Sequence, residues 1–244
     1  MKITIITISF NAEKTIEKTL MSIESQSYDN IEHIIVDGGS KDNTLEICNS
    51  FPHVSKIISE SDKGVYDAFN KGLKIATGDI IGFLNADDVF YESNSVLEIV
   101  NAFSINETDI VYGNLDYVNE DGKVIRNWVS KPYKRGLIKK AWMPAHPTFY
   151  CKKEIYNRLG GYNDSFKIAG DFELCIRFLE VYKVHSFYLN KKLVKMLVGG
   201  VSNNGLKSKW TIFKEELRAL KLNEIKINPL KFFIFKLRKL IQFI

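Results

Sequence analysis

Two adjacent acidic residues have the spacing and context to bind a divalent cation. Asp87 and Asp88 follow the apolar segment 80–84 after two intervening residues. Hard cations such as Mg²⁺ and Mn²⁺ prefer oxygen ligands, and a protein often supplies only one or two while substrate phosphates supply the rest. A carboxylate pair at the end of a strand therefore suits a metal-bound diphosphate. The alternative is that one of the two caps the next helix.

Two more polar clusters are candidates for ligand binding. Asp37 ends an apolar segment and is followed by Gly38, Gly39 and Ser40, where the glycines let a ligand approach the backbone; a tight turn is the alternative. Asp67, Asn70 and Lys71 share one face of an expected helix. Such a face could bind a base, ribose or phosphate, or it could carry only a solvated ion pair between Asp67 and Lys71.

A candidate general base and a candidate partner lie in the second half of the chain. Asp171 opens an expected helix over residues 170–181, where the helix dipole favours its charged form. This is an ordinary place for a carboxylate and also a good one for a general base. His146 lies in an expected loop between Ala145 and Pro147 rather than on an apolar face, which argues against a histidine buried in the core.

The elements that must position these residues alternate between strand and helix. Expected strands at 2–9, 32–36, 54–59 and 79–84 are separated by helices starting near 12, over 42–50 and over 65–76. This alternation predicts a parallel sheet with helices on both faces, and ligands bind such sheets beyond the carboxyl ends of the strands. The second half predicts strands at 109–117, 123–129, 148–151 and 184–189, and helices at 152–159 and 170–181.

Composition and charge narrow the class of protein. The 244 residues carry a formal charge of +5, but residues 206–244 alone carry +7 and the remainder −2. This distribution excludes a nucleic-acid reader with basic residues spread over its surface. The three cysteines lie far apart without a C-x-x-C pair, which indicates a reducing compartment rather than a disulfide framework. No apolar run is long enough to span a bilayer and no cleavage site follows the start, so we expect a cytoplasmic protein.

The order of these motifs resembles family 2 glycosyltransferases of the GT-A fold, which are inverting and depend on a nucleotide-sugar. The resemblance covers Ile3 to about Asn203. Each motif by itself is weak, and their common order and spacing make the signal strong. The residues that carry it are Ile8-Ser9-Phe10-Asn11, 36–44, 62–72, Gly78-Asp79 with 84–88, His146-Pro147-Thr148, Gly160-Gly161-Tyr162 and 170–174.

The resemblance implies an α/β fold with a Rossmann-like, mixed and mostly parallel sheet flanked by helices. It divides residues 1–205 into a nucleotide-sugar-binding half, 1–90, and an acceptor-binding half, 91–205. It also implies roles. Asp171 would be the catalytic base, His146 and Glu173 would lie on the acceptor side, and Asp87 and Asp88 would bind Mg²⁺ or Mn²⁺. The donor would be bound by Ser9, Asn11, Asp37, Asp62, Asp67, Lys71, Asn85 and Ala86.

The sequence departs from the family pattern at two of these positions. Asn85 replaces the first acid of the family's Asp-x-Asp signature, and Gly170 precedes Asp171 where Glu-Asp is common.

The implied activity is transfer of one hexose-type sugar, with inversion, from a nucleotide-diphosphate donor to a saccharide or lipid-linked saccharide acceptor. A UDP-sugar is the expected donor, and surface polysaccharide biosynthesis the expected setting. Two alternatives stay open. One is a sugar-nucleotide pyrophosphorylase, which would need a Gly-rich phosphate loop after the first strand. The other is a non-catalytic protein that binds the nucleotide-sugar.

The basic tail, residues 206–244, predicts from Leu230 onward a helix with two kinds of surface. Its apolar arc comprises Leu230, Phe233, Ile234, Leu237, Leu240, Ile241 and Ile244, and the cations Lys231, Lys236, Arg238 and Lys239 lie off this arc among Phe232, Phe235 and Phe243. A basic amphipathic helix suits an anionic membrane surface, which places the protein peripherally on the inner face of the plasma membrane. The alternative is a helix packed on the core or on a second subunit.

Overall fold

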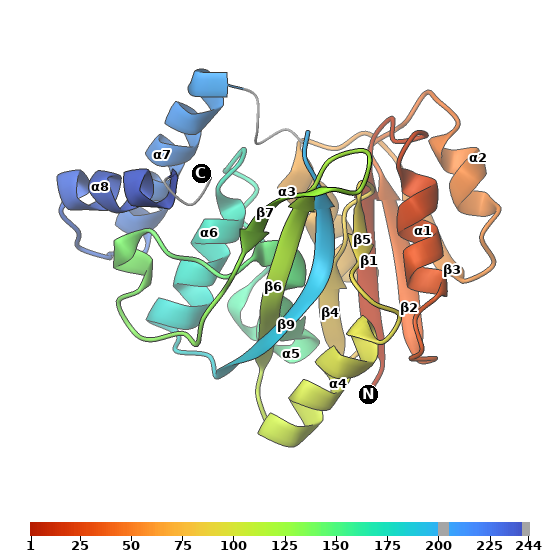
Figure 1. The fold of residues 1–244 in the computed structure, drawn as a ribbon, viewed down its shortest axis with the longest axis horizontal. Helices are drawn as coiled ribbons and strands as arrows, with labels where there is room; N and C mark the ends of the chain where they lie inside the picture. The colour runs from red at the N-terminus through yellow and green to blue at the C-terminus, as the bar shows by residue number, and fades with distance from the viewer. Residues whose placement is uncertain (200–204, 241–244) are drawn as a thin grey trace.

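A single curled sheet of nine strands forms the centre of the molecule (Figure 1). The computed structural model describes residues 1–199 and 205–240. Eight strands follow the order β3-β2-β1-β4-β8-β6-β9-β5, and β7 pairs with β6 outside this path. The sheet therefore runs without a break through both halves of the chain.

The first half has the expected alternation of strands and helices. The strands of this half pair with one another in parallel, as the alternation of strands and helices predicted. Its elements are β1 (Ile3–Ser9), α1 (Ile16–Glu24), β2 (Ile31–Asp37), α2 (Thr44–Asn49), β3 (Val54–Ser59), α3 (Val65–Ile75) and β4 (Ile80–Phe83).

The second half mixes parallel and antiparallel pairing. Strand β6 pairs in parallel with β9 and antiparallel with β7 and β8. The elements are β5 (Asp88–Phe90), α4 (Ser95–Asn106), β6 (Ile110–Val118), β7 (Val124–Trp128), η1 (Ile138–Lys140), η2 (His146–Thr148), β8 (Tyr150–Lys152), α5 (Lys153–Leu159), α6 (Gly170–Cys175), η3 (Ile176–Val181) and β9 (Ser186–Leu197).

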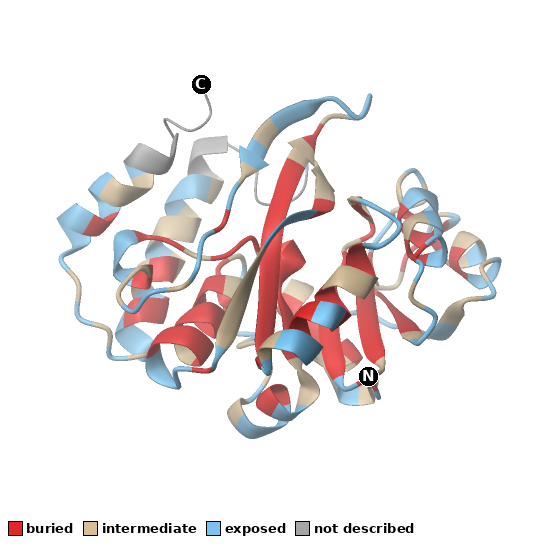
Figure 2. Cartoon of the chain, turned by 60° about the horizontal axis from the view of Figure 1, so that its bottom comes forward, coloured by how far each residue is buried: buried red, intermediate tan, exposed pale blue. Residues whose placement is uncertain are grey.

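Two apolar layers cover the two faces of the sheet (Figure 2). Along β1, Ile3 and Ile5 pack into the layer beneath α4, while Ile6 packs with α3, α5 and α6 on the other face. Successive side chains of a strand point to opposite faces, so a strand covered on both faces is apolar almost throughout. Each fully buried Ile stabilises the fold by roughly 1.5–3 kcal/mol.

Four elements differ from the sequence expectation. Strand β5 and helix α4 were not predicted. Strand β5 has only three residues and acquires its strand character from antiparallel pairing with β9. Strand β9 extends to Leu197, well beyond the expected end at 189, since its second part pairs with both β5 and β6. The expected helix over 170–181 is wound as an α-helix only to Cys175 and as a π-helix from Ile176.

The tail forms two helices, α7 (Gly205–Leu222) and α8 (Pro229–Leu240), which lie together at one end of the molecule (Figure 1). The expected boundary between residues 1–205 and the tail falls beside residues 200–204, which with 241–244 lie outside the described residues. No helix in the described part of the chain combines the length and the apolar character needed to cross a bilayer.

Candidate functional site

The carboxyl ends of β1, β2 and β4 meet at one edge of the sheet, as the alternation of strands and helices predicted. Ser9 and Asp37 are paired in register at the ends of β1 and β2. The amide of Ala86 donates to the carbonyl of Ile8 at 3.3 Å, so the segment after β4 lies beside the end of β1. The polar clusters that follow the three strands therefore share one site.

Asp37 has a different position from the one expected. It was expected to help bind the donor, but it is fully buried and its carboxylate accepts hydrogen bonds from within the chain. It accepts hydrogen bonds from the amides of Gly39 and Ser40 at 3.0 and 2.9 Å and from Ser59 Oγ at 2.7 Å. Burial alone would raise the pKa of Asp37, and the bonds from Ser40, Ser59 and Gly39 more than offset this and lower it. Asp37 therefore shapes the loop. Ser9, also buried, donates to it at 3.2 Å.

Asn11 links the first two strand ends and is open to solvent. Its backbone has a φ of 49°, in the left-handed region that Asn tolerates better than most residues. Its Oδ1 accepts from the amide of Lys41 at 2.9 Å, and its own amide donates to Ser40 Oγ at 2.8 Å. The preceding Phe10 is 64% exposed, although it is a large aromatic residue between two polar ones. That sequence context is the signal by which Phe10 could have been recognised as a site residue.

The segment 60–71 forms a second wall of this edge. A Cβ on Gly38 would lie 2.6 Å from Asp62 Oδ2, so the absence of a side chain at Gly38 lets Asp62 approach the loop after β2. Asp62 also accepts from the amide of Gly64 at 2.9 Å.

Asp67 and Lys71 hold that wall together. The amide of Lys63 donates to Asp67 Oδ2 at 3.0 Å and lowers the pKa of this carboxyl. Lys71 Nζ lies 3.4 Å from Asp67 and 3.0 Å from Glu60, and it donates to the carbonyl of Ser61 at 2.9 Å. The ion pair that the sequence left as an alternative is therefore present.

The residues predicted to bind the metal are largely buried after β4. Burial raises the pKa of Asp87, and burial together with the charge of Asp87 raises the pKa of Asp88 well above its usual range. Asn85 Oδ1 and both carboxyl oxygens of Asp88 are buried and receive no hydrogen bond of good geometry from the described residues. The backbone amide of Leu197 lowers the pKa of Asp88 and so opposes part of this rise. Ala86 is buried beside them.

These buried oxygens fit a hard divalent cation. A cation would favour the ionised form of both carboxyls and would compensate for the loss of water around them. Among residues 1–199 and 205–240, no three His, Cys, Asp or Glu side chains converge to hold a metal. Proteins commonly bind Mg²⁺ through one or two carboxylates and complete its coordination with water and substrate phosphate.

Asp171 lies at the start of α6 and is held from two sides. The amide of Phe172 donates to Asp171 Oδ1 at 2.8 Å, and the Tyr66 hydroxyl lies 3.3 Å from the same oxygen. His146 Nδ1 lies 3.3 Å from Asp171 Oδ2, which makes an ion pair when the imidazole is protonated. Helices α3 and α6 and the loop before β8 thus bring together three residues that are far apart in the sequence.

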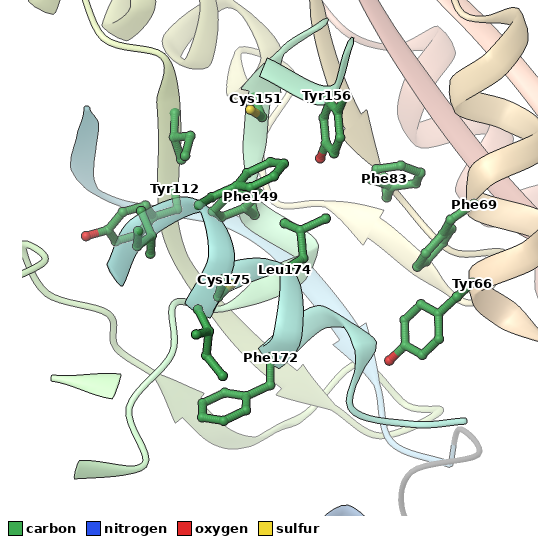
Figure 3. Packing of buried hydrophobic residues seen from close by; sticks show 14 of the residues in the cluster. Tyr66, Phe69, Phe83, Tyr112, Phe149, Cys151, Tyr156, Phe172, Leu174 and Cys175 are labelled. Atoms are coloured by element: carbon green, nitrogen blue, oxygen red, sulfur yellow. The ribbon is translucent and has the colours of Figure 1, made fainter. Parts of the chain in front are cut away.

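Tyr66 also explains the glycine that precedes Asp171. Figure 3 shows the Tyr66 side chain extending from α3 toward α6. A Cβ at Gly170 would lie 2.7–2.9 Å from three atoms of the Tyr66 ring, closer than carbon atoms normally approach. The ring stacks on Tyr162, and its hydroxyl donates to the carbonyl of Ile168 at 2.6 Å. Only glycine fits at position 170 while the ring stays in place.

Glu173 does not reach this site. It was predicted on the acceptor side, but it is buried against α7 and pairs with Arg177 at 3.0 Å. Its Oε1 also accepts from Asn223 Nδ2 at 3.2 Å. Residues two apart on a helix point in nearly opposite directions, so Asp171 and Glu173 face different neighbours. In this structure Glu173 therefore lies away from Asp171 and His146, against Arg177 and Asn223.

Strand pairing brings further residues to the site that the sequence did not indicate. Asp88 is paired with Met196, Met196 with Tyr117, and Tyr117 with Arg126, which makes one row across four strands. Burial raises the pKa of Tyr117 to about 12; Arg126 opposes this rise, while Asp88 and Asp171 add to it. Tyr117 therefore lies within electrostatic range of both the candidate metal ligand and the candidate base.

Trp128 joins this row to His146. The Trp128 and Tyr117 rings are parallel within 5° with centroids 6.2 Å apart, and the guanidinium of Arg126 lies over both rings. The Trp128 and His146 rings meet edge to face, with centroids 6.5 Å apart. A cluster of partly exposed aromatic rings therefore borders Asp171. No local sequence pattern marked it, because strand register assembles it.

Residues 4–168 match the family described as Glycosyl transferase family 2. A PGL/p-HBAD biosynthesis glycosyltransferase of Mycobacterium bovis is 31% identical over 178 residues, which cover 71% of this chain and 68% of that protein. An uncharacterized glycosyltransferase of Mycobacterium tuberculosis is 32% identical over 181 residues, 72% of this chain and 68% of the relative.

Solved structures share the fold at low sequence identity. S. aureus TarS 1–349 in complex with UDP-GlcNAc superposes with a TM-score of 0.73 at 18% identity, covering 93% of this chain and 68% of that one. The mannosyltransferase PcManGT from Pyrobaculum calidifontis, in complex with GDP-Man and Mn²⁺, gives 0.65 at 19% identity, covering 92% and 69%. The GT-A-like fold expected from the sequence is confirmed.

Proposed function

Because the chain belongs to Glycosyl transferase family 2, we propose that it transfers one hexose-type sugar, with inversion, from a UDP-sugar to a saccharide or lipid-linked saccharide acceptor in surface polysaccharide biosynthesis. One observation carries this proposal. Paired strands link Asp88 to Tyr117, and ring contacts run from Tyr117 through Trp128 to His146, whose Nδ1 lies 3.3 Å from Asp171. A base and a diphosphate site that lie this close suit a single displacement.

The donor is proposed from the site and from the fold. The edge at β1, β2 and β4 offers the exposed Phe10 and Asn11 beside Asp62, a surface suited to a nucleoside. TarS has been crystallised with UDP-GlcNAc and PcManGT with GDP-Man, and the likeness to both supports a nucleotide-sugar donor here. The Gly-rich phosphate loop that a pyrophosphorylase would need after the first strand is not present in residues 9–12.

The mechanism follows from these positions. Asp171 accepts the proton of an acceptor hydroxyl, whose oxygen then bonds to the anomeric carbon. The bond between that carbon and the diphosphate oxygen breaks, and the nucleoside diphosphate leaves with the electron pair. One displacement inverts the centre, so an α-linked donor gives a β-linked product. A Mg²⁺ or Mn²⁺ ion held by Asp87, with Asn85 and Asp88 beside it, would supply charge neutralisation to the leaving diphosphate.

Three other features of the protein have a role in this proposal. Tyr66 and the amide of Phe172 donate to one oxygen of Asp171, and His146 Nδ1 lies 3.3 Å from the other, where the protonated imidazole would pair with it. The bonds made by Asp37, Asp67 and Lys71 hold the loops around the donor. We also propose that the basic tail keeps the enzyme on the cytoplasmic face of the plasma membrane, near a lipid-linked acceptor.

The test measures UDP release and donor binding separately. Asp171→Asn should keep the affinity for UDP-GlcNAc or another bound UDP-sugar and lower turnover by about two orders of magnitude or more. Asp87→Ala should lower turnover similarly and remove the dependence of donor binding on Mg²⁺ or Mn²⁺, measured by calorimetry with and without EDTA. Asp164→Asn, at an exposed carboxylate of the same region, is the matched control.

Two results would contradict the proposal. Turnover near the wild-type rate in Asp171→Asn would exclude this residue as the base. A wild-type protein that binds UDP-sugars and releases no UDP with any acceptor would favour the alternative of a non-catalytic binding protein.

A further inference from the structure

Helix α8 has one face on the protein core and an opposite face in solvent. Phe232 is fully buried, with its ring centroid 6.2 Å from that of Phe172 and 6.3 Å from that of Phe213. Phe235 packs against the same core. In the sequence analysis both residues lay outside the apolar arc, among the cations. The helix is therefore attached to the core by the face opposite that arc.

The predicted apolar arc is the exposed face. Leu230 is 68% exposed, and Phe233, Ile234 and Leu237 are each 40–44% exposed. Their spacing of three, four and seven residues puts them on one side of α8, opposite Phe232. The side chain of Leu240 and residues 241–244 lie outside the described residues.

This apolar surface continues onto α7. The Phe233 ring meets Phe213 edge to face at 5.4 Å, and Phe213 stacks on Trp210 at 5.7 Å. Trp210 is itself 55% exposed, and Lys214 Nζ lies 5.3 Å from its ring centroid. An aromatic ring with a cation beside it is common at membrane interfaces.

A basic loop lies against the same helix. Segment η1 contacts α8, and the loop 131–144 that contains it has five cations and no acid. All five are exposed: Lys131, Lys134, Arg135, Lys139 and Lys140. The buried Glu180 fixes the loop, since it accepts hydrogen bonds from the Tyr133 hydroxyl and from the amide of Gly136. The cations are thus presented from an anchored segment.

We infer that the α8 arc, Trp210 and the basic loop together form one surface that docks on an anionic lipid bilayer. This inference rests on the proposed function with a lipid-linked saccharide as the acceptor. It adds a second basic element, in the middle of the chain, to the tail. Charge complementarity selects the partner: a loop with five exposed cations and no acid, beside exposed apolar side chains, matches anionic headgroups over acyl chains. Each cation near such a surface raises affinity roughly fivefold.

The docking surface is continuous with the acceptor side of the site. The basic loop starts just after Trp128, at the end of β7, and leads to His146, which lies 3.3 Å from Asp171. A bilayer against this loop would therefore bring a lipid-linked sugar toward the base rather than toward the donor edge at Phe10 and Asn11.

The experiment is sedimentation of the full chain with vesicles of phosphatidylcholine alone or with 30% phosphatidylglycerol. The wild type should bind the anionic vesicles at least tenfold more tightly. Lys139→Glu with Lys140→Glu should lower that affinity at least tenfold, and Ile234→Ser with Leu237→Ser should lower it on both kinds of vesicle. Lys14→Glu with Lys18→Glu makes the same charge change at exposed positions near α1 and should lose less than threefold.

Three outcomes would overturn the inference: no preference of the wild type for anionic vesicles, an equal loss in both lysine pairs, or a dimer in solution that Ile234→Ser with Leu237→Ser dissolves. UDP release from a UDP-sugar with water as the acceptor measures the proposed activity separately from membrane docking. The loop variant should keep that rate, whereas a wild type without UDP release that still binds vesicles would refute only the proposed activity.

Discussion

Gly170→Ala tests the interpretation that Tyr66 determines which residue can precede the base. Two effects oppose each other. Alanine at the start of α6 stabilises a helix by at most about 1 kcal/mol relative to glycine. The new Cβ, however, would lie 2.7, 2.8 and 2.9 Å from three ring atoms of Tyr66, and that ring is buried and stacked on Tyr162. Overpacking of this kind costs about 1–3 kcal/mol.

The clash therefore outweighs the gain, and the free energy of unfolding should fall by about 1–2 kcal/mol. In a Tyr66→Leu background two of the three clashing ring atoms, Cε2 and Cζ, are gone. There Gly170→Ala should be neutral or stabilising. Urea unfolding of the two single variants, the double variant and the wild type gives the coupling energy, which we expect to be about 1–3 kcal/mol.

UDP release supplies a second measurement on the same proteins. Displacing the Tyr66 ring moves the hydroxyl that lies 3.3 Å from Asp171 Oδ1. Turnover in Gly170→Ala should fall about tenfold or more, with the Michaelis constant for the donor little changed. Equal destabilisation by Gly170→Ala in the wild-type and Tyr66→Leu backgrounds would refute the proposed contact, whatever the turnover.

Two further changes probe other parts of the chain. Burial, together with the charge of His53, lowers the pKa of the fully buried His33 to about 3. The unfolded chain protonates His33 more readily than the folded chain does. The contribution of His33 to the free energy of unfolding is therefore fully present above about pH 6.5 and is lost as the pH falls toward 3. When the pH falls from 6.5 to 4.5, above the pKa of about 2 of folded Glu32, the wild type should lose about 2–3 kcal/mol of its free energy of unfolding through His33. His33→Gln should not show this loss. An equal dependence of the free energy of unfolding on pH in both proteins, measured by urea unfolding, would contradict this. Trp128→Ala should raise the Michaelis constant of a saccharide acceptor about tenfold and Trp128→Phe much less, while UDP release to water stays constant; equal loss in both reactions would show a general structural role.

The sequence by itself determined the α/β class, the position of the site and the helical character of the tail. These depend on local patterns. Alternation at periods of two and 3.6 residues reports which face of an element is buried, and parallel strands place all their carboxyl ends at one edge. The polar clusters after β1, β2 and β4 could therefore be assigned to one site, and Asp171 and His146 could be selected as candidates.

Tertiary structure decided what each side chain does there. Asp37 was expected to face a ligand, but the bonds from Gly39, Ser40 and Ser59 turn it inward. Glu173 was placed on the acceptor side, but Arg177 and Asn223 hold it on the other side of α6. A polar residue at a helix start or a strand end has several possible partners within reach, and only packing selects among them.

The remaining features depend on contacts between distant segments. Tyr66 and Asp171 are 105 residues apart, so no local period relates them, and the reason for Gly170 is visible only when the Tyr66 ring is in place. The row from Asp88 to Arg126 exists because of the register of four strands. In the tail, the sequence identified the apolar arc of α8, but only the fold showed that Phe232 attaches the helix and leaves that arc exposed.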